Sequence, residues 1–151
     1  MTVNTKENTM NFKKADIYSR SKGETNDCAV KAVSIACDVP YHVAHKALAL
    51  QGRQNRRGSM KSWIDRAIQS LGFKTKIVHH SAATVTSLSG DRAVEKGHYV
   101  AYVKGHILAI VDGKVEDWTD GKRHRIHYVE SVTPAVSRKE RQAMKAKLMA
   151  Q

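Results

Sequence analysis

The feature that most constrains the fold of this chain is a change of sequence pattern close to Gly72. Before this point, apolar residues recur at helical spacing, which is typical of helices that bury one side. After it, short apolar runs and alternating segments, separated by turn residues, predict strands. Helices followed by an antiparallel sheet are typical of the α+β class. We therefore expect an α+β fold with N-terminal helices packed on a C-terminal sheet.

Three helices are expected before the change of pattern. The first covers residues 28–37, where valines form a buried stripe and alanines keep the helix slim. The second begins near Pro40, a residue suited to a first helical turn, and stops at Gly52. The third has Ser59 as its N-cap and ends near Leu71.

Five strand-like segments follow. A stretch rich in Ser, Thr, Ala and Gly, residues 81–92, predicts a loop between the first strand and the others. Asp112-Gly113 is a strong signal for a tight hairpin turn. The expected strands cover residues 73–78, 98–103, 106–111, 114–118 and 125–129.

The 151 residues suit one domain with two flanking segments. Residues 1–22 are polar and are expected to form an arm with a short ordered piece around Phe12, Ile17 and Tyr18, and residues 23–132 form the domain. Residues 133–151 are expected to hold a basic helix, because Ser137 and Glu140 make a capping box at its start.

Several classes of protein are excluded by composition. No stretch approaches the length of a membrane span, and the N-terminus lacks the apolar segment of a signal peptide. Two cysteines are too few for a disulfide scaffold, so we expect a cytoplasmic protein with free thiols. No cofactor is expected, since no phosphate-binding glycine loop is present. No metal site is expected either, because His42 and His45 lack an obvious third ligand.

The net charge of +12 favours polyanionic partners, although a solvated basic surface is the simpler interpretation. Basic residues gather in three places: after the second helix, in a turn near residue 123, and in the C-terminal helix. The candidates for binding nucleic acid or another anion are Arg53, Arg56, Arg57, Lys122, Arg123, Arg138, Lys139 and Arg141.

Cys28 is the candidate nucleophile. It follows Asn26 and Asp27, either of which can be the N-cap, and so lies in the first turn of a helix. The helix dipole favours a negative charge there, which lowers the pKa of a thiol. Cys37 falls on the apolar stripe of the same helix and fits a buried, inert residue better.

A histidine and an acid on the predicted hairpin complete a possible catalytic set. His106 opens one strand, and Asp117 returns beside it after the Asp-Gly turn. Glu116 is equally close by counting from the turn, but adjacent residues point to opposite faces, and we prefer Asp117. His98 opens the preceding strand in the same way and is the rival base.

The segments Asn26-Asp27-Cys28-Ala29-Val30 and Gly105-His106, continuing to Asp117-Trp118, resemble small papain-like cysteine proteins of bacteriophages and, more distantly, the peptidase domains of bacteriocin exporters. The stretch 52–58 is similar to the phage group as well. The resemblance covers residues 23–130. It implies a papain-like fold with Cys28 as nucleophile, His106 as base and Asp117 as the acid that orients the imidazole.

One departure concerns the oxyanion. Papain-like enzymes usually carry a Gln several residues before the nucleophile, whereas this chain has Ser21-Lys22-Gly23-Glu24 there. The Cys28 amide can supply one hydrogen bond, and Asn26 or Lys22 is the candidate for a second.

Two functions follow from these patterns. The first is a thiol hydrolase of peptidase type that attacks a peptide or isopeptide carbonyl of a protein substrate. It would be phage-encoded and act in the host cytoplasm or in the virion. The alternative is a basic, non-catalytic protein of the same fold that contacts nucleic acid or forms part of a phage particle.

Overall fold

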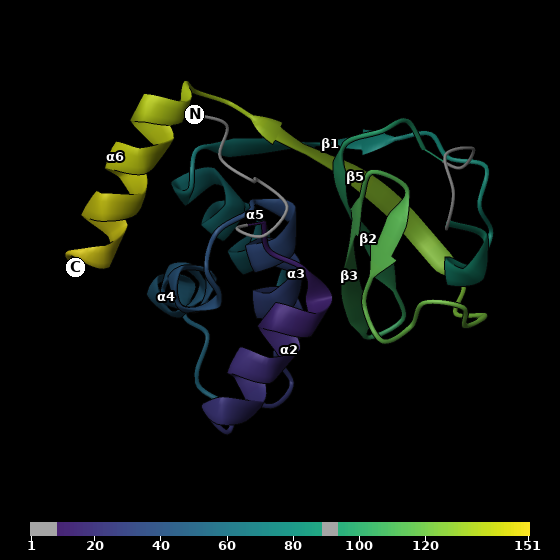
Figure 1. Cartoon of the computed structure of the whole chain (residues 1–151), viewed down its shortest axis with the longest axis horizontal. Coiled ribbons are helices and arrows are strands. Elements are labelled where there is room, and N and C mark those ends of the chain that lie inside the picture. Colours follow the sequence, from purple (N-terminus) through teal and green to yellow (C-terminus); the bar gives the residue numbers. More distant parts are fainter. Residues whose placement is uncertain (1–8, 89–93) are drawn as a thin grey trace.

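The computed structural model describes residues 9–88 and 94–151. Residues 1–8 of the expected arm and 89–92 of the expected loop lie outside this part. The described chain contains five α-helices and one five-stranded antiparallel sheet, which confirms the α+β class (Figure 1). The helices are α2 (Phe12–Ser21), α3 (Cys28–Ala36), α4 (Tyr41–Gln51), α5 (Lys61–Ser70) and α6 (Arg138–Met149).

The sheet has the strand order β1-β5-β2-β3-β4, with antiparallel pairing between all neighbours. The last strand is therefore inserted between the first and the second. A short 3-10 helix, η1 (Val85–Leu88), follows β1. The strands are β1 (Phe73–Val78), β2 (His98–Val103), β3 (His106–Val111), β4 (Lys114–Glu116) and β5 (Ile126–Pro134).

The sheet is covered on both faces. Helices α2 to α5 lie on one face, and η1 lies on the other (Figure 1). Along β3, Ile107 and Ala109 join the core under the helices, whereas Leu108 and Ile110 join a second core with η1. Burial on both faces explains why β3 reads as a continuous apolar run instead of an alternating one.

Helix α3 is the central element of the helical layer. Seven of its nine residues are buried, and it packs directly against β3. Its alanines, Ala29, Ala32 and Ala36, leave little side chain between the two backbones. This close approach brings the first residue of α3, Cys28, to the sheet.

The N-terminal segment is more ordered than a polar arm. Asn11 caps α2 by accepting a hydrogen bond from the Lys14 amide, and Ala15 and Ser19 are buried. The helix thus covers apolar surface beside α3. Only these two residues of the helix are buried, which is why the sequence pattern alone reads as polar.

Other element ends differ by small amounts from expectation. Pro40 is the N-cap of α4, and Met60, not Ser59, is the N-cap of α5. Ser137 caps α6 as expected, since its side chain accepts a hydrogen bond from the Glu140 amide. β5 continues to Pro134 because its last residues pair with β1.

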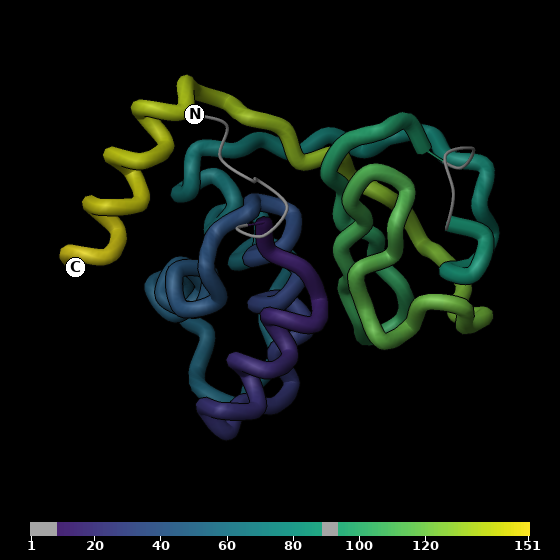
Figure 2. The backbone as a smooth tube through the Cα atoms, viewed as in Figure 1, coloured from purple at the N-terminus to yellow at the C-terminus, as the bar shows by residue number. Residues whose placement is uncertain are grey.

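Figure 2 shows by colour where each part of the chain lies in the fold. The first part of the chain forms the helical side, the green part forms much of the sheet, and the yellow C-terminal segment crosses back to the helical side. No helix within residues 9–88 and 94–151 combines the length and the apolar character needed to cross a membrane.

Candidate active site

A cleft of about 410 Å³ opens between α2, the start of α3 and the β3–β4 hairpin. Cys28, His106 and Asp117 all line it, although they come from distant parts of the chain. The remaining lining residues are Asp16, Ser19, Arg20, Glu24, Thr25, Asn26, Asp27, Lys31, Gly105 and Trp118. The cleft thus joins a thiol, an imidazole and a carboxylate in one strongly polar setting.

Cys28 is the first residue of α3 and is half-buried. Its neighbour Asp27 is the N-cap residue, yet the Asp27 side chain makes no capping bond. Instead, Asp27 Oδ2 accepts hydrogen bonds from Ser19 Oγ at 2.5 Å and from Tyr41 Oη at 2.6 Å. The carboxylate is held back from the helix start, so it does not occupy the amides that favour a thiolate there.

His106 and Asp117 form a short hydrogen-bonded pair. The distance from His106 Nε2 to Asp117 Oδ2 is 2.7 Å. Asp117 is buried, and the same oxygen accepts hydrogen bonds from the amide and the hydroxyl of Thr119. Because Nε2 is engaged by Asp117, Nδ1 is the nitrogen left to face Cys28. The carboxylate therefore fixes both the orientation and the tautomer of the imidazole.

The electrostatics of the three groups favour an ion pair. Burial disfavours the imidazolium, but Asp117 and Cys28 outweigh it and raise the pKa of His106 to about 9. Burial also raises the pKa of the Cys28 thiol, whereas hydrogen bonds from His106 and the Ile107 amide lower it, and the net pKa is below its usual value. A thiolate beside an imidazolium is the reactive form of a catalytic cysteine.

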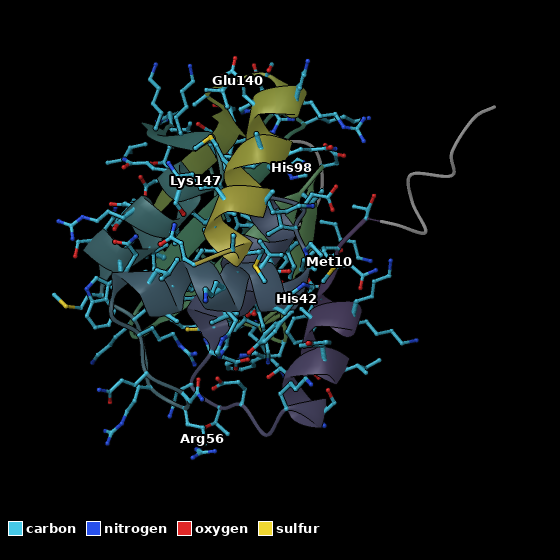
Figure 3. All side chains as sticks on the ribbon, turned by 90° about the vertical axis from the view of Figure 1, so that its left-hand side faces the viewer. Met10, His42, Arg56, His98, Glu140 and Lys147 are labelled. Atoms are coloured by element: carbon cyan, nitrogen blue, oxygen red, sulfur yellow. The ribbon has the colours of Figure 1, made fainter. Side chains whose placement is uncertain are left out.

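The alternatives at each position lie elsewhere. Glu116 accepts a hydrogen bond from the Phe12 amide at 2.9 Å and does not line the cleft. The imidazole of His98 lies 2.9 Å from the Ala36 carbonyl, measured from Nδ1, at the far end of α3 (Figure 3). Cys37 is buried at that same end, and burial raises the pKa of its thiol well above the usual value.

The two oxyanion candidates are placed differently. Asn26 lines the cleft with a left-handed backbone (φ 51°), and its Nδ2 donates to the Arg56 carbonyl at 3.2 Å. Lys22 is not part of the lining, and its ammonium lies 5.5 Å from the centre of the Tyr18 ring. Among the candidates from the sequence, only Asn26 is therefore beside Cys28.

A buried ion pair holds the segment before Cys28 in place. The sequence did not indicate this pair. Glu24 accepts hydrogen bonds from both terminal nitrogens of Arg53 and from the Arg56 amide. Its carboxylate also lies 2.7 Å from His45 Nε2. Burial opposes ionisation of Glu24, yet these hydrogen bonds lower its pKa to about 2. Glu24 precedes Arg53 by 29 residues, and no spacing rule connects them.

The structure therefore corrects the expectation that Arg53 binds an external anion. Arg53 was a candidate for binding nucleic acid or another anion, but its side chain is only 1% exposed. The guanidinium is already paired with Glu24 and cannot meet an external partner without breaking that pair.

The other basic candidates are spread over the molecule. Arg56, Arg57, Lys122, Arg123, Arg138 and Lys139 are exposed, and Arg141 is half-buried. In Figure 1, α6 lies at one end of the long axis, and the segment between β4 and β5 lies near the other. Arg56 projects from the molecule away from α6 in Figure 3. These seven candidates thus do not gather on one face of the molecule.

Trp118 is a further residue of the cleft whose role the sequence did not indicate. Its side chain is 55% exposed, and its ring centre lies 5.4 Å from that of His106. An exposed indole at the rim is apolar surface available to a ligand. No group of three or more His, Cys, Asp or Glu residues in the described part of the chain is arranged to hold a metal ion.

Comparison of the chain with protein-family models, with curated proteins and with solved structures found no match.

Proposed function

We propose that this chain is a papain-like thiol hydrolase of peptidase type, which cleaves a peptide or isopeptide bond of a protein substrate. The observation that carries the proposal is the meeting of Cys28, His106 and Asp117 in one cleft, with the pKa of the thiol lowered and that of the imidazole raised. The segments around Cys28 and His106 resemble phage proteins. On this basis we also propose that the protein is encoded by a phage and acts in the host cytoplasm or in the virion.

The geometry supports a two-step reaction. The Cys28 thiolate attacks the carbonyl carbon, and His106 gives its proton to the leaving amine as the C–N bond breaks. Water then attacks the thioester, His106 takes a proton from that water, and the carboxylic acid leaves Cys28. Asp117 keeps the imidazole oriented through both steps. The Cys28 amide is a donor available to the oxyanion, and Asn26 Nδ2, which already donates one hydrogen to the Arg56 carbonyl, has a second hydrogen to offer.

Alkylation with iodoacetamide tests the activated thiol. Cys28 should react near neutral pH much faster than Cys37, which is buried and serves as the internal control. His106→Ala should slow Cys28 and leave Cys37 unchanged, with labelling at each site read by peptide mass mapping. Slow labelling of both cysteines to the same extent would exclude the proposed site.

Turnover is tested separately with an activated ester such as p-nitrophenyl acetate, which needs no specific recognition. Release of nitrophenol should continue beyond one equivalent and be abolished in Cys28→Ala. A labelled but non-hydrolysing Cys28 would show that the site is built but inactive, and would favour the second candidate function.

That second candidate is a basic binding protein that contacts nucleic acid or other phage components. The net charge of +12 and the missing oxyanion Gln favour it. Phosphate contacts release counterions, so binding to an oligonucleotide should weaken steeply as salt is raised. Absence of binding at low salt would remove this alternative.

A further inference from the structure

A second hollow, of about 500 Å³, lies at the opposite end of α3 from Cys28. α3 has nine residues, so its two ends are about 12–14 Å apart. The hollow is enclosed by α6, the segment after α3, and the ends of β1, β2 and β5. Its lining residues are Ala36, Cys37, Asp38, Val39, Leu71, Phe73, His98, Val132, Pro134, Arg138, Arg141, Gln142 and Lys145.

The two sides of the hollow differ in chemistry. Val39, Leu71 and Val132 are buried core residues at the base of the hollow. Phe73 and Pro134 add more exposed apolar surface beside them, so together they form an apolar floor. α6 contributes three cations on the facing wall, Arg138, Arg141 and Lys145. An apolar floor beside a row of cations matches a ligand that carries both aliphatic groups and negative charges.

Negative charge within the hollow does not offset these cations. Asp38 is the one acidic residue of the lining, and its Oδ1 accepts a hydrogen bond from the Met10 amide. His98, which Figure 3 shows beside α6, is directed by its Nδ1 to the Ala36 carbonyl. The wall formed by α6 therefore keeps a net positive charge toward the opening.

The cations of α6 do not contribute equally. Arg141 donates from Nη1 to the Val136 carbonyl at 2.7 Å, and its guanidinium lies 5.2 Å from the centre of the Phe73 ring. This residue anchors α6 to the sheet. Arg138 is exposed and Lys145 is half-buried, so these two are the groups that can meet a ligand.

We propose that this hollow is a docking site for an acidic peptide segment of a partner protein. Leucine-like side chains of the segment would rest on the apolar floor, chiefly on its accessible residues Phe73 and Pro134, and its carboxylates would pair with Arg138 and Lys145. In an extended peptide successive side chains point to opposite faces, so alternating leucines and glutamates can turn the leucines to the floor and the carboxylates to the facing wall formed by α6.

A nucleic acid fits the same hollow less well. Single strands bind by stacking bases on aromatic side chains, with cations along the backbone. The two aromatic rings in the lining are Phe73 and His98. The guanidinium of Arg141 already lies over the Phe73 ring, and His98 Nδ1 is hydrogen-bonded with the Ala36 carbonyl. The base of the hollow between them is aliphatic and offers no stacking surface.

Fluorescence anisotropy with the full chain tests this proposal. The probe is a short fluorescein-labelled peptide of glutamates and leucines, compared with one in which serine replaces leucine and one in which lysine replaces glutamate. We expect only the glutamate–leucine peptide to bind appreciably, and its affinity should fall as salt is raised.

Two double variants locate the site. Arg138→Glu with Lys145→Glu should weaken binding about tenfold or more, since two ion pairs become repulsive contacts. Lys122→Glu with Arg123→Glu changes the net charge equally at the other end of the molecule and should leave the affinity unchanged. Circular dichroism and thermal melts check that both variants fold.

Several results would overturn the proposal. They are the absence of peptide binding, equal losses in the two double variants, equal binding of the serine peptide, and displacement of the peptide by an oligonucleotide that binds through Arg138 and Lys145. The proposal does not depend on the thiol hydrolase assignment, because Cys28 labelling should be the same in both double variants and in the unmodified chain.

Discussion

Replacing Asp117 by Asn isolates the contribution of the carboxylate to the thiolate–imidazolium pair. Asn has nearly the same shape and keeps an oxygen that can accept the two hydrogen bonds from Thr119. The negative charge beside His106 is lost, while the burial that disfavours the imidazolium remains. The variant should therefore lower the pKa of His106. It also removes the direct repulsion by which Asp117 raises the pKa of Cys28, but the weaker stabilisation of the thiolate by the imidazolium should outweigh this, so the pKa of Cys28 should rise on balance.

The size of the effect follows from the His106 pKa. A rise from 6.5 to about 9 corresponds to about 3 kcal/mol in favour of the imidazolium. Asp117 acts both by its hydrogen bond and by its charge, and Cys28 supplies the remaining increase. An opposite charge at this range shifts a pKa by about 1 to 3 units, so the imidazolium should lose about 1.4–4 kcal/mol of stabilisation. Below the pKa of Cys28, each unit by which that pKa rises lowers the thiolate fraction about tenfold.

The assay is the rate of iodoacetamide labelling of Cys28 as a function of pH. The acid limb of the profile should move to higher pH in Asp117→Asn, and NMR titration of the His106 imidazole should show the matching downward shift. Glu116→Gln is the matched control, since this adjacent carboxylate bonds the Phe12 amide and not the imidazole. An unchanged profile in Asp117→Asn, or an equal shift in Glu116→Gln, would refute the electrostatic reasoning.

Two further predictions concern stability. Glu24→Gln should destabilise the fold by about 3 kcal/mol near neutral pH, because it leaves Arg53 buried without its carboxylate. The native pKa of Glu24, about 2, lies below its ordinary value of 4.5, so the stabilisation is full above about pH 4.5 and is lost as pH falls to about 2. Urea melts of both proteins should therefore converge in acid, and a constant difference would contradict this. Ser137→Ala should cost α6 about 1 kcal/mol by removing its N-cap, seen as faster amide exchange in α6 alone.

The sequence predicts local features of the site well. His106 and Asp117 are 11 residues apart on either side of a tight turn, so pattern and spacing are enough to bring them together. Strand periodicity also gives the position of β3 to the residue. The preference for Asp117 over Glu116 had little basis in the sequence, and the structure supplies the reason for it: Glu116 ends β4 and turns to the Phe12 amide, whereas Asp117 bonds His106.

Features that depend on distant segments could not be predicted in this way. His98 and His106 open similar strands, and only the antiparallel register separates them. His98 pairs with Val111 and His106 with Val103, so the two histidines lie at opposite ends of one hairpin. The burial of Arg53 depends on Glu24, far earlier in the chain, and nothing in the pattern of either segment distinguishes a buried arginine from an exposed one.

The arrangement of the hairpin and α3 has a consequence for folding. The His106–Asp117 contact closes a short loop and can form as soon as the hairpin forms, whereas the Cys28–His106 contact requires α3 to dock on β3 across most of the domain. A chain with the hairpin formed but α3 undocked therefore carries an ordinary, weakly reactive thiol. The nucleophilicity of Cys28 therefore depends on a long-range contact, and a newly made chain stays chemically unreactive at this thiol until α3 has docked on β3.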